Sequence, residues 1–514
     1  MKSITTFVLA LTGICICSVF NLHAQFSGGG TGRAADPFKI KTAADLNNVR
    51  NYVGTGNADK HFRLMNDIDL TTFLQSSTEG WLPIGDNNNR FTGYFHGGGH
   101  TVSGLWIDRS NTDDIGLFSV NQGTIDSLGV DIYGASINGT YLGGVYGNNF
   151  VGGLVGYNCL GSKINECHTT GGITSSSVSA SKAYTGGLIG YNDGGSITNC
   201  FATNNSSAFG NYYSAVYSGG LIGYNAGTVS NCYAKGKSNV GLACIYGQYS
   251  GGFVGYNTGT ISNCYATGDI SSYSAIISSV PKITTNFGGF VGQNEGTITD
   301  CYATGNVPGN NYSTGSWYSY SAGGFVGYLS AGRISNCYAV GQVTSNGSPG
   351  SFTAFAGYCG NANYLSQCYY NSEINGSMKG VGNNTGSANV FGKNTTDMKS
   401  KATFVNWNFS TIWAIKEGNS YPYFQWQDAT SQTGIQFVQK DGNTMIVFPN
   451  PATDNITLSG LQSNETLRLY NLNGQLMLTR KAAGETETIA IGHLPAGIYF
   501  VKTEMRQALK FLKK

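Results

Sequence analysis

The stretch GGFVGYNTGTISNCYA, residues 251–266, decides the fold because close copies of it recur along the chain. Seven copies lie between residues 150 and 370, and each joins a glycine-led half to a segment that closes on a cysteine. Successive cysteines lie 33, 32, 32, 37, 36 and 31 residues apart, a period that indicates a solenoid or an array of repeats. The apolar residue three places before each cysteine gives the pairs Ile164/Cys167, Ile197/Cys200, Val229/Cys232, Ile261/Cys264, Ile298/Cys301, Ile334/Cys337 and Leu365/Cys368.

The period favours a parallel β-solenoid over other repeat folds. A four-stranded propeller blade takes about 40 to 50 residues, and helical repeats need a 3.6-residue apolar spacing that these repeats lack. In a parallel solenoid each turn adds two or three short strands, and equivalent residues stack about 4.8 Å apart. We therefore predict an all-β fold, an elongated parallel β-solenoid (β-helix) with the seven cysteines in one column.

Spacing within the repeat predicts two corners. Ile261 and Cys264 are three residues apart, so both can face the core only if the chain turns at Ser262 and Asn263. Asparagine tolerates the left-handed conformation that such a turn needs. The paired glycines predict a second corner, at which a side chain would obstruct the stack.

The repeat unit GG[LF]VGYN-x-G-x-I-x-N-C-Y-A resembles the GLUG repeat of large bacterial surface and secreted proteins, over residues 115–370. The upstream stretch, with DPFKIKTAADLNNV from Asp36 and GGGHTVSGLWI from Gly97, is similar to the segment that precedes such repeats. The motif is structural, so the resemblance implies a fold and supplies no catalytic residue.

The N-terminal residues predict export and a cap. Lys2, the apolar run 7–20 and a small residue at Ala24 are typical of a signal peptide cut between Ala24 and Gln25. Further on, Thr42 and Asp45 resemble a capping box, which predicts a short helix over the first turn. No later segment reaches the ~18 apolar residues of a membrane helix, so no transmembrane segment is expected.

The last seventy residues predict a separate β-sandwich. Seven short alternating segments start near residues 445, 456, 467, 475, 488, 498 and 509. The phrases FPNPATDNI from Phe448, LYNLNGQ from Leu469 and LPAGIYFVK from Leu494 resemble the type A C-terminal sorting domain of the type IX secretion system. That resemblance implies contact with the secretion machinery through residues 443–514. It also implies export through the periplasm of a Bacteroidetes-type bacterium to the outer surface or beyond, with removal of this domain.

These features divide the chain into six expected parts. An aromatic segment before the sandwich could plug the last turn, and a polar linker follows it. The expected parts are 1–24, signal peptide; 25–114, N-terminal cap and first turns; 115–372, GLUG solenoid; 373–428, aromatic C-terminal cap; 429–442, linker; and 443–514, sorting domain.

Ten cysteines follow the expected signal peptide, and the secretory route would permit disulfides. Stacked cysteines point the same way, and proximity alone does not give disulfide geometry, so we predict a reduced, buried column. Cys159, Cys244 and Cys359 stand outside this column. The chain lacks a C-x-x-C pair, and we expect no metal or cofactor.

Composition and residue pattern favour binding over catalysis. Charged residues make up 11% of the chain and the net charge is +2, so no nucleic-acid partner is expected. Carboxylates in the repeats are scattered, and His96-Gly97-Gly98-Gly99-His100 lacks a nucleophile elbow, so we predict no catalytic residue.

Variable segments before each glycine pair carry aromatic residues among Ser, Asn and Gly, which suits adhesion to a glycan or another surface ligand. The alternatives are a covering strand in a passive surface spacer and, less favoured, a polysaccharide-degrading β-helix enzyme. The candidate ligand-binding residues are Tyr212, Tyr213, Tyr217, Tyr246, Tyr249, Tyr312, Trp317, Tyr318 and Tyr320.

Overall fold

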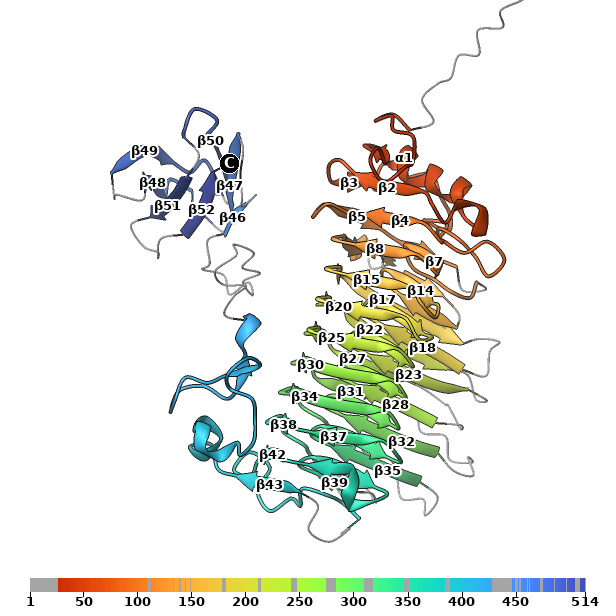
Figure 1. The fold of residues 1–514 in the computed structure, drawn as a ribbon, viewed down its shortest axis with the longest axis vertical. Coiled ribbons are helices and arrows are strands. Elements are labelled where there is room, and N and C mark those ends of the chain that lie inside the picture. The colour runs from red at the N-terminus through yellow and green to blue at the C-terminus, as the bar shows by residue number, and fades with distance from the viewer. Residues whose placement is uncertain are drawn as a thin grey trace, which may run out of the picture. The chain divides into compact units, whose positions relative to one another are not determined.

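The fold was obtained as a computed structural model, shown in Figure 1. It describes residues 26–514 apart from 110–111, 133, 138–139, 144, 148, 178–181, 211–213, 242–246, 274–282, 309–317, 346–350, 384–388, 428–445, 449–451, 453, 460, 462, 472–474, 485, 496, 504–508 and 514. The predicted signal peptide with its cut at Ala24 and Gln25, the linker and Cys244 therefore lie outside the described residues. The chain divides into two compact units, Met1–Thr395 and Thr396–Lys514.

The first unit is the predicted parallel β-solenoid, a stack of turns whose central turns each contribute strands to four sheets (Figure 1). One turn runs through β20 (Ser196–Thr198) and β21 (Phe201–Ala202) in the first sheet, then β22 (Asn205–Gly210) in the second. It continues through β23 (Ala215–Gly219) in the third sheet and β24 (Ile222–Asn225) in the fourth. Strands of successive turns pair in parallel, as predicted from the repeat period.

The first sheet has 20 strands and carries the Ile and Cys positions on its inner side. Its strands are β1 (Phe38–Ile40), β2 (His61–Leu64), β3 (Ile68–Asp69), β4 (Tyr94–His96), β5 (Thr101–Leu105), β8 (Thr124–Asp126), β9 (Gly129–Ile132), β15 (Lys163–Asn165), β16 (His168–Thr170), β20, β21, β25 (Thr228–Ser230), β26 (Tyr233–Ala234), β30 (Thr260–Ala266), β34 (Thr297–Ala303), β37 (Arg333–Ser335), β38 (Tyr338–Ala339), β41 (Leu365–Ser366), β42 (Cys368–Asn371) and β43 (Val390–Lys393).

The other three sheets complete the turns. The second sheet contains β6 (Ile107–Asp108), β12 (Val145–Gly147), β17 (Gly172–Ser177), β22, β27 (Ser238–Gly241) and β31 (Ile270–Tyr273). The third contains β13 (Phe150–Gly152), β18 (Lys182–Gly186), β23, β28 (Gly247–Gly251), β32 (Ile283–Gly288), β35 (Tyr318–Gly323) and β39 (Ser351–Thr353). The fourth contains β7 (Phe118–Asn121), β14 (Val155–Asn158), β19 (Ile189–Asn192), β24, β29 (Val254–Asn257), β33 (Val291–Asn294), β36 (Val326–Leu329) and β40 (Ala356–Cys359).

Both predicted corners are present. Ile261 and Cys264 are each fully buried, and the asparagine between them has a φ of 54°, in the left-handed region. The equivalent asparagines at 199, 231 and 336 have φ values of 55°, 54° and 53°, so the asparagine corner is confirmed. At the glycine corner, a Cβ on Gly220 would lie 2.2 Å from the carbonyl oxygen of Gly252, which explains the paired glycines.

Inside the solenoid, buried asparagines form a hydrogen-bonded ladder along the axis. Each side-chain amide donates to the amide oxygen of the next turn at 2.8 Å, from Asn121 through Asn158, Asn192, Asn225 and Asn257 to Asn294. A second, smaller core lies between the second and third sheets, where Ala208 and Val216 are buried. There, buried serines pair across the two sheets, with Ser238 Oγ 2.9 Å from Ser250 Oγ.

The predicted capping helix is α1 (Ala43–Asn48), at the N-terminal end of the solenoid (Figure 1). Thr42 Oγ1 accepts the Asp45 N–H at 3.1 Å, and an Asp45 carboxylate oxygen accepts the Thr42 N–H, which completes the capping box. Leu46 and Val49 are buried in the same core as the first strands. The stacked strands continue to β43, beyond the expected boundary at residue 372.

The second unit contains an aromatic cluster and a β-sandwich. In the cluster, Trp413 stacks against Trp407 and Phe424 with ring centroids 4.5 Å apart in both pairs. The sandwich has a three-stranded and a four-stranded antiparallel sheet. Its strands, all seven of which were predicted, are β46 (Ile446–Phe448), β47 (Asn455–Ser459), β48 (Thr466–Asn471), β49 (Leu476–Lys481), β50 (Thr486–Ala490), β51 (Gly497–Thr503) and β52 (Leu509–Lys513).

Candidate functional site

The predicted ligand-binding residues fall in two groups. Five of them lie outside the described residues, namely Tyr212, Tyr213, Tyr246, Tyr312 and Trp317. Tyr318 is the first residue of β35, and its side chain lies outside the described part of the chain. Tyr217 and Tyr320, in the third sheet, are only 7% and 4% exposed, and Tyr249 is partly buried. For Tyr217 and Tyr320 the structure supports the alternative reading, a strand whose tyrosines pack within the turn, because neither ring can present a face to a ligand.

Tyr217 belongs to a double column of aromatic side chains at the glycine corner, which we call the tyrosine strip. The column on the third sheet stacks with ring centroids 4.6 to 5.3 Å apart, and that on the fourth sheet includes pairs at 5.2 and 4.4 Å. The tyrosine strip consists of Phe150, Tyr184, Tyr217 and Tyr249 on the third sheet and Tyr157, Tyr191, Tyr224 and Tyr256 on the fourth.

Stacking decides what the tyrosine strip can offer to a ligand. The rings of Tyr157 and Tyr191 are within 3° of parallel, and those of Tyr191 and Tyr224 within 8°. Their faces therefore cover one another, and the partly exposed fourth-sheet column presents ring edges and hydroxyl groups. The GYN repeat signals this column in the sequence, but its packing against the third-sheet tyrosines depends on the fold.

Two carboxylates lie beside the tyrosine strip. Tyr157 donates to Asp193 one turn ahead, with 2.7 Å between Oη and Oδ2, and the carboxylate of Glu295 lies near the phenol of Tyr256. Burial raises the pKa of both phenols, and the neighbouring carboxylate raises it further because it disfavours a second negative charge. These tyrosines are therefore fixed as neutral donors, and the carboxylates give this surface a negative potential.

The cysteine column lies on the inner side of the first sheet. The backbone N–H of Cys167 points to Cys200 Sγ at 3.3 Å, Cys200 N–H to Cys232 Sγ at 3.3 Å, and Cys264 pairs in register with Cys301. All seven members, Cys167, Cys200, Cys232, Cys264, Cys301, Cys337 and Cys368, are fully buried.

Each column thiol donates to a backbone carbonyl, as Cys264 does to Ser262 O at 3.0 Å. Burial raises the pKa of the Cys264 thiol well above its usual value, which disfavours a reactive thiolate. The nine cysteines in the described part of the chain, Cys159 and Cys359 included, form no disulfide with one another.

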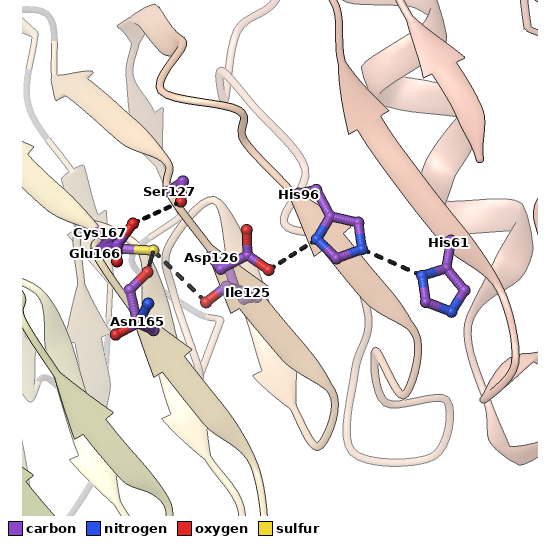
Figure 2. A network of polar contacts seen from close by, with 8 residues as sticks. All are labelled: His61, His96, Ile125, Asp126, Ser127, Asn165, Glu166 and Cys167. Carbon is purple, nitrogen blue, oxygen red and sulfur yellow. Dashed lines mark hydrogen bonds and ion pairs between the residues drawn. The ribbon is translucent and has the colours of Figure 1, made fainter. Parts of the chain in front are cut away.

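A polar network occupies the outer side of the first sheet near the N-terminal turns (Figure 2). His96 lies between two partners, with Nδ1 2.8 Å from Asp126 Oδ2 and Nε2 3.1 Å from Nδ1 of His61. His61 in turn stacks on Tyr94 with ring centroids 4.2 Å apart. Burial and the neighbouring His96 lower the pKa of His61, because both disfavour its charged form.

This arrangement orients the imidazoles but brings too few groups together for a metal. A carboxylate on Nδ1 fixes a proton there, so His96 Nε2 accepts and His61 Nδ1 donates. The His96-Gly97-Gly98-Gly99-His100 segment forms a turn, with positive φ at Gly98 and Gly99, and His100 Nδ1 lies 3.2 Å from Asp67. Over the residues that the structure describes, no three His, Cys, Asp or Glu side chains gather closely enough to hold a metal ion. Over the same residues, no helix combines the length and the apolar character needed to cross a membrane.

Comparison with family models identifies both parts of the chain. The GLUG motif matches residues 183–207, 214–240, 246–271, 284–307 and 318–344, and the secretion system C-terminal sorting domain matches residues 446–514. The chain carries GLUG repeats and a type IX sorting domain. The sorting domain directs the GLUG protein through type IX export to the cell surface or outside the cell, and it implies contact with that machinery.

Two similar proteins match about a quarter of this chain each. A protein named "Putative Gly-rich membrane protein" from Evansella cellulosilytica is 38% identical over 149 residues, 26% of this chain and 17% of its own length. Halomucin from Haloquadratum walsbyi is 35% identical over 173 residues, 28% of this chain and 2% of its own length. The chain thus covers a small share of either relative.

Among solved structures, one described as a "putative immunoglobulin A1 protease from Bacteroides ovatus" is similar with 19% sequence identity and a TM-score of 0.42. The match covers 78% of this chain and 96% of the other.

Proposed function

We propose that the exported GLUG protein is a non-catalytic binding protein of the cell surface, which adheres to a glycan or to another surface ligand. Its binding residues belong to the segments of the chain between strands of the second sheet and strands of the third. Tyr212, Tyr213, Tyr246, Tyr312 and Trp317 belong to the segments that make this connection. A passive surface spacer is the alternative, because the stacked columns described above also make a rigid rod.

The observation that carries the proposal is that the largest length variation in turns β22 to β32 falls in these connecting segments. Four residues separate β22 from β23, five separate β27 from β28, and nine separate β31 from β32. In these turns the paired strands keep their register, and the connections begin and end on strands that stack on one another. Variable segments held by a rigid scaffold are where binding residues concentrate in proteins.

The test compares aromatic residues of the variable connections with a buried aromatic residue, on cells that display equal amounts of protein. The variant Tyr212→Ala/Tyr213→Ala/Trp317→Ala should lose attachment to the ligand surface, found by glycan array, and keep the thermal unfolding of the parent. Tyr320→Ala is the matched control, because that buried ring should affect unfolding rather than binding.

Two results would contradict the binding role. Equal attachment by the triple variant and the parent would support the spacer. Release of new reducing ends from a polysaccharide by the parent protein would support the degrading enzyme.

We also propose that the sandwich acts only as an export signal and is removed near residues 429–442. Deleting residues 443–514 should leave the thermal unfolding of the solenoid unchanged, because the sandwich has its own core. The truncated protein should accumulate in the periplasm, as measured by surface proteolysis with mass spectrometry. Normal surface display of the truncation, or mature surface protein that still carries Lys514, would contradict this role.

A further inference from the structure

The fourth-sheet column of the tyrosine strip is interrupted at one turn. Gln293 takes the position between Tyr256 and Tyr328 in the strand register, where the preceding turns have tyrosine. Tyr256 is turned by 84° relative to Tyr224, whereas the previous pair is within 8° of parallel. Among the described residues, the ring contact of Tyr328 is with Tyr358 in the following turn, so no ring covers its side toward Gln293.

An exposed carboxylate occupies this interruption. Glu295 accepts hydrogen bonds from Gln293 Nε2 and from Ser330 Oγ, both at 3.0 Å. Its bond to Gln293 places the carboxylate beside the column position between Tyr256 and Tyr328. Burial raises the pKa of the Tyr249, Tyr256 and Tyr328 phenols, and the charge of Glu295 raises it further.

A buried amide oxygen adds to the negative potential. Asn286 is 1% exposed and donates its Nδ2 to Gln293 Oε1 at 3.2 Å, but its Oδ1 has no hydrogen-bond donor. Within the described part of the chain, Glu295 also forms no ion pair with Lys, Arg or His. A carboxylate, aromatic rings and an unsatisfied carbonyl oxygen thus gather here with no cation beside them.

We propose that this interruption, formed by Tyr249, Tyr256, Gln293, Glu295 and Tyr328, binds an organic ammonium group. Aromatic rings attract alkylammonium ions through their electron-rich faces, and a carboxylate adds charge. A hard metal cation fits less well, because Ca²⁺ takes six to eight oxygen ligands and a single carboxylate stands here. The site contains none of Tyr212, Tyr213, Tyr246, Tyr312 and Trp317, on which the proposed adhesion depends, so the two proposals can be tested separately.

The test uses choline as the ammonium probe and the protein from residue 26 to residue 514, with binding measured by calorimetry. The parent protein should bind choline, and Glu295→Gln, at an exposed position, should weaken binding about tenfold or more. The uncharged isostere 3,3-dimethylbutan-1-ol should bind at least about tenfold more weakly than choline, because it keeps the shape and lacks the charge.

Asp193→Asn is the matched control. Asp193 is likewise a carboxylate beside the fourth-sheet column, where it accepts a hydrogen bond from Tyr157, but it stands where the fourth-sheet rings stack without a break. Choline affinity of this variant should stay within about twofold of the parent. The proposal is overturned if the parent does not bind choline, if Glu295→Gln binds as well as the parent, if Asp193→Asn loses as much affinity as Glu295→Gln, or if the isostere equals choline.

Discussion

The asparagine corner of the first sheet and the glycine corner between the third and fourth sheets both turn the chain sharply, but by different physical means. The asparagine corner needs a left-handed backbone, and its side chain points away from the core, where Asn263 Nδ2 donates to Asn231 Oδ1 of the preceding turn at 3.4 Å. Non-asparagine residues therefore also occupy it, with φ values of 51° to 54° at Ser127, Glu166, Asp300 and Gln367. The glycine corner needs room, since a Cβ on Gly251 would lie 2.0 Å from the Val254 carbonyl oxygen. One corner thus constrains a dihedral angle and tolerates several residues. The other constrains volume and holds paired glycines from Gly152 to Gly324, and it gives way to Thr353 and Ala354 in the turn that follows.

The largest loss of stability is expected on the inner side of the asparagine corner. Cys264→Asp places a charge in a fully buried column that offers it no cationic partner, which costs about 4 kcal/mol or leaves the acid protonated. Thermal unfolding of the solenoid should fall accordingly, and the fall should be smaller at pH 4, where the carboxyl is neutral. Unfolding equal to that of the parent would show that the corner does not bury this side chain.

Gly252→Ala tests the glycine corner and should cost about 3 kcal/mol. The new Cβ would lie 2.2 Å from the Gly289 carbonyl oxygen, and the backbone cannot move without disturbing the next turn. Gly56→Ala is the control, because a Cβ there meets no atom within 4 Å. The urea midpoint of Gly252→Ala should be lower than that of Gly56→Ala. Equal midpoints would mean that the backbone at the glycine corner can move to make room for a Cβ.

A third, charged corner should depend on pH. Asp114 has a φ of 52° and is 3% exposed, and burial raises its carboxyl pKa to about 6 although Asn87 donates to it at 2.6 Å. The folded chain therefore holds this proton more tightly than the unfolded chain does. Its contribution to stability is full below pH 4 and is lost as the pH rises through about 6.

Asp114→Asn should accordingly stabilise the protein at pH 7, by on the order of 2 to 3 kcal/mol. Asparagine suits the positive φ and can still accept the hydrogen bond from Asn87. The gain should vanish at pH 4, where the parent carboxyl is protonated. Unfolding curves at the two pH values measure this, and a gain of the same size at both would exclude the carboxyl charge as its cause.

The smallest effect is expected for the outward residue of the asparagine corner. Asn263→Ala keeps the core intact but places alanine at a φ of 54°. Alanine has a Cβ and lacks the side-chain amide that helps asparagine to adopt this conformation, so the free energy of unfolding should fall by about 1 kcal/mol. Asn263→Gly should cost less, because glycine adopts this conformation freely. The comparison between the corners would fail if the alanine variant proved as damaging as Gly252→Ala in the same urea titration.

The sequence predicts those features that repeat with the period. The Ile and Cys spacing gave the buried pair and the left-handed asparagine, and the alternating pattern of the last residues gave all seven sandwich strands. Such features depend on contacts within one turn or between equivalent positions of neighbouring turns, so the spacing of residues in the sequence is enough to predict them.

The remaining features depend on contacts between turns that differ. Tyr217 is buried against tyrosine rings of the fourth sheet, and Tyr320 is buried in the small core between the second and third sheets. Spacing within one segment does not reveal either contact. His96 contacts Asp126, and Glu295 contacts Ser330. The residues of each pair are thirty or more positions apart in the sequence, at turns where the repeat is irregular. Their side chains meet only because the register places one turn directly over the next.

The buried asparagine ladder has a consequence for the evolution of length. Each amide donates forward and accepts from behind, so every turn of the ladder presents the same two bonding ends to its neighbours. A complete repeat inserted within the ladder would connect to both sides through bonds that already exist, and it would lengthen the solenoid by about 4.8 Å. The reach of such a protein from the cell surface can therefore change in fixed steps, through duplication or loss of whole repeats, without a new interface at any step.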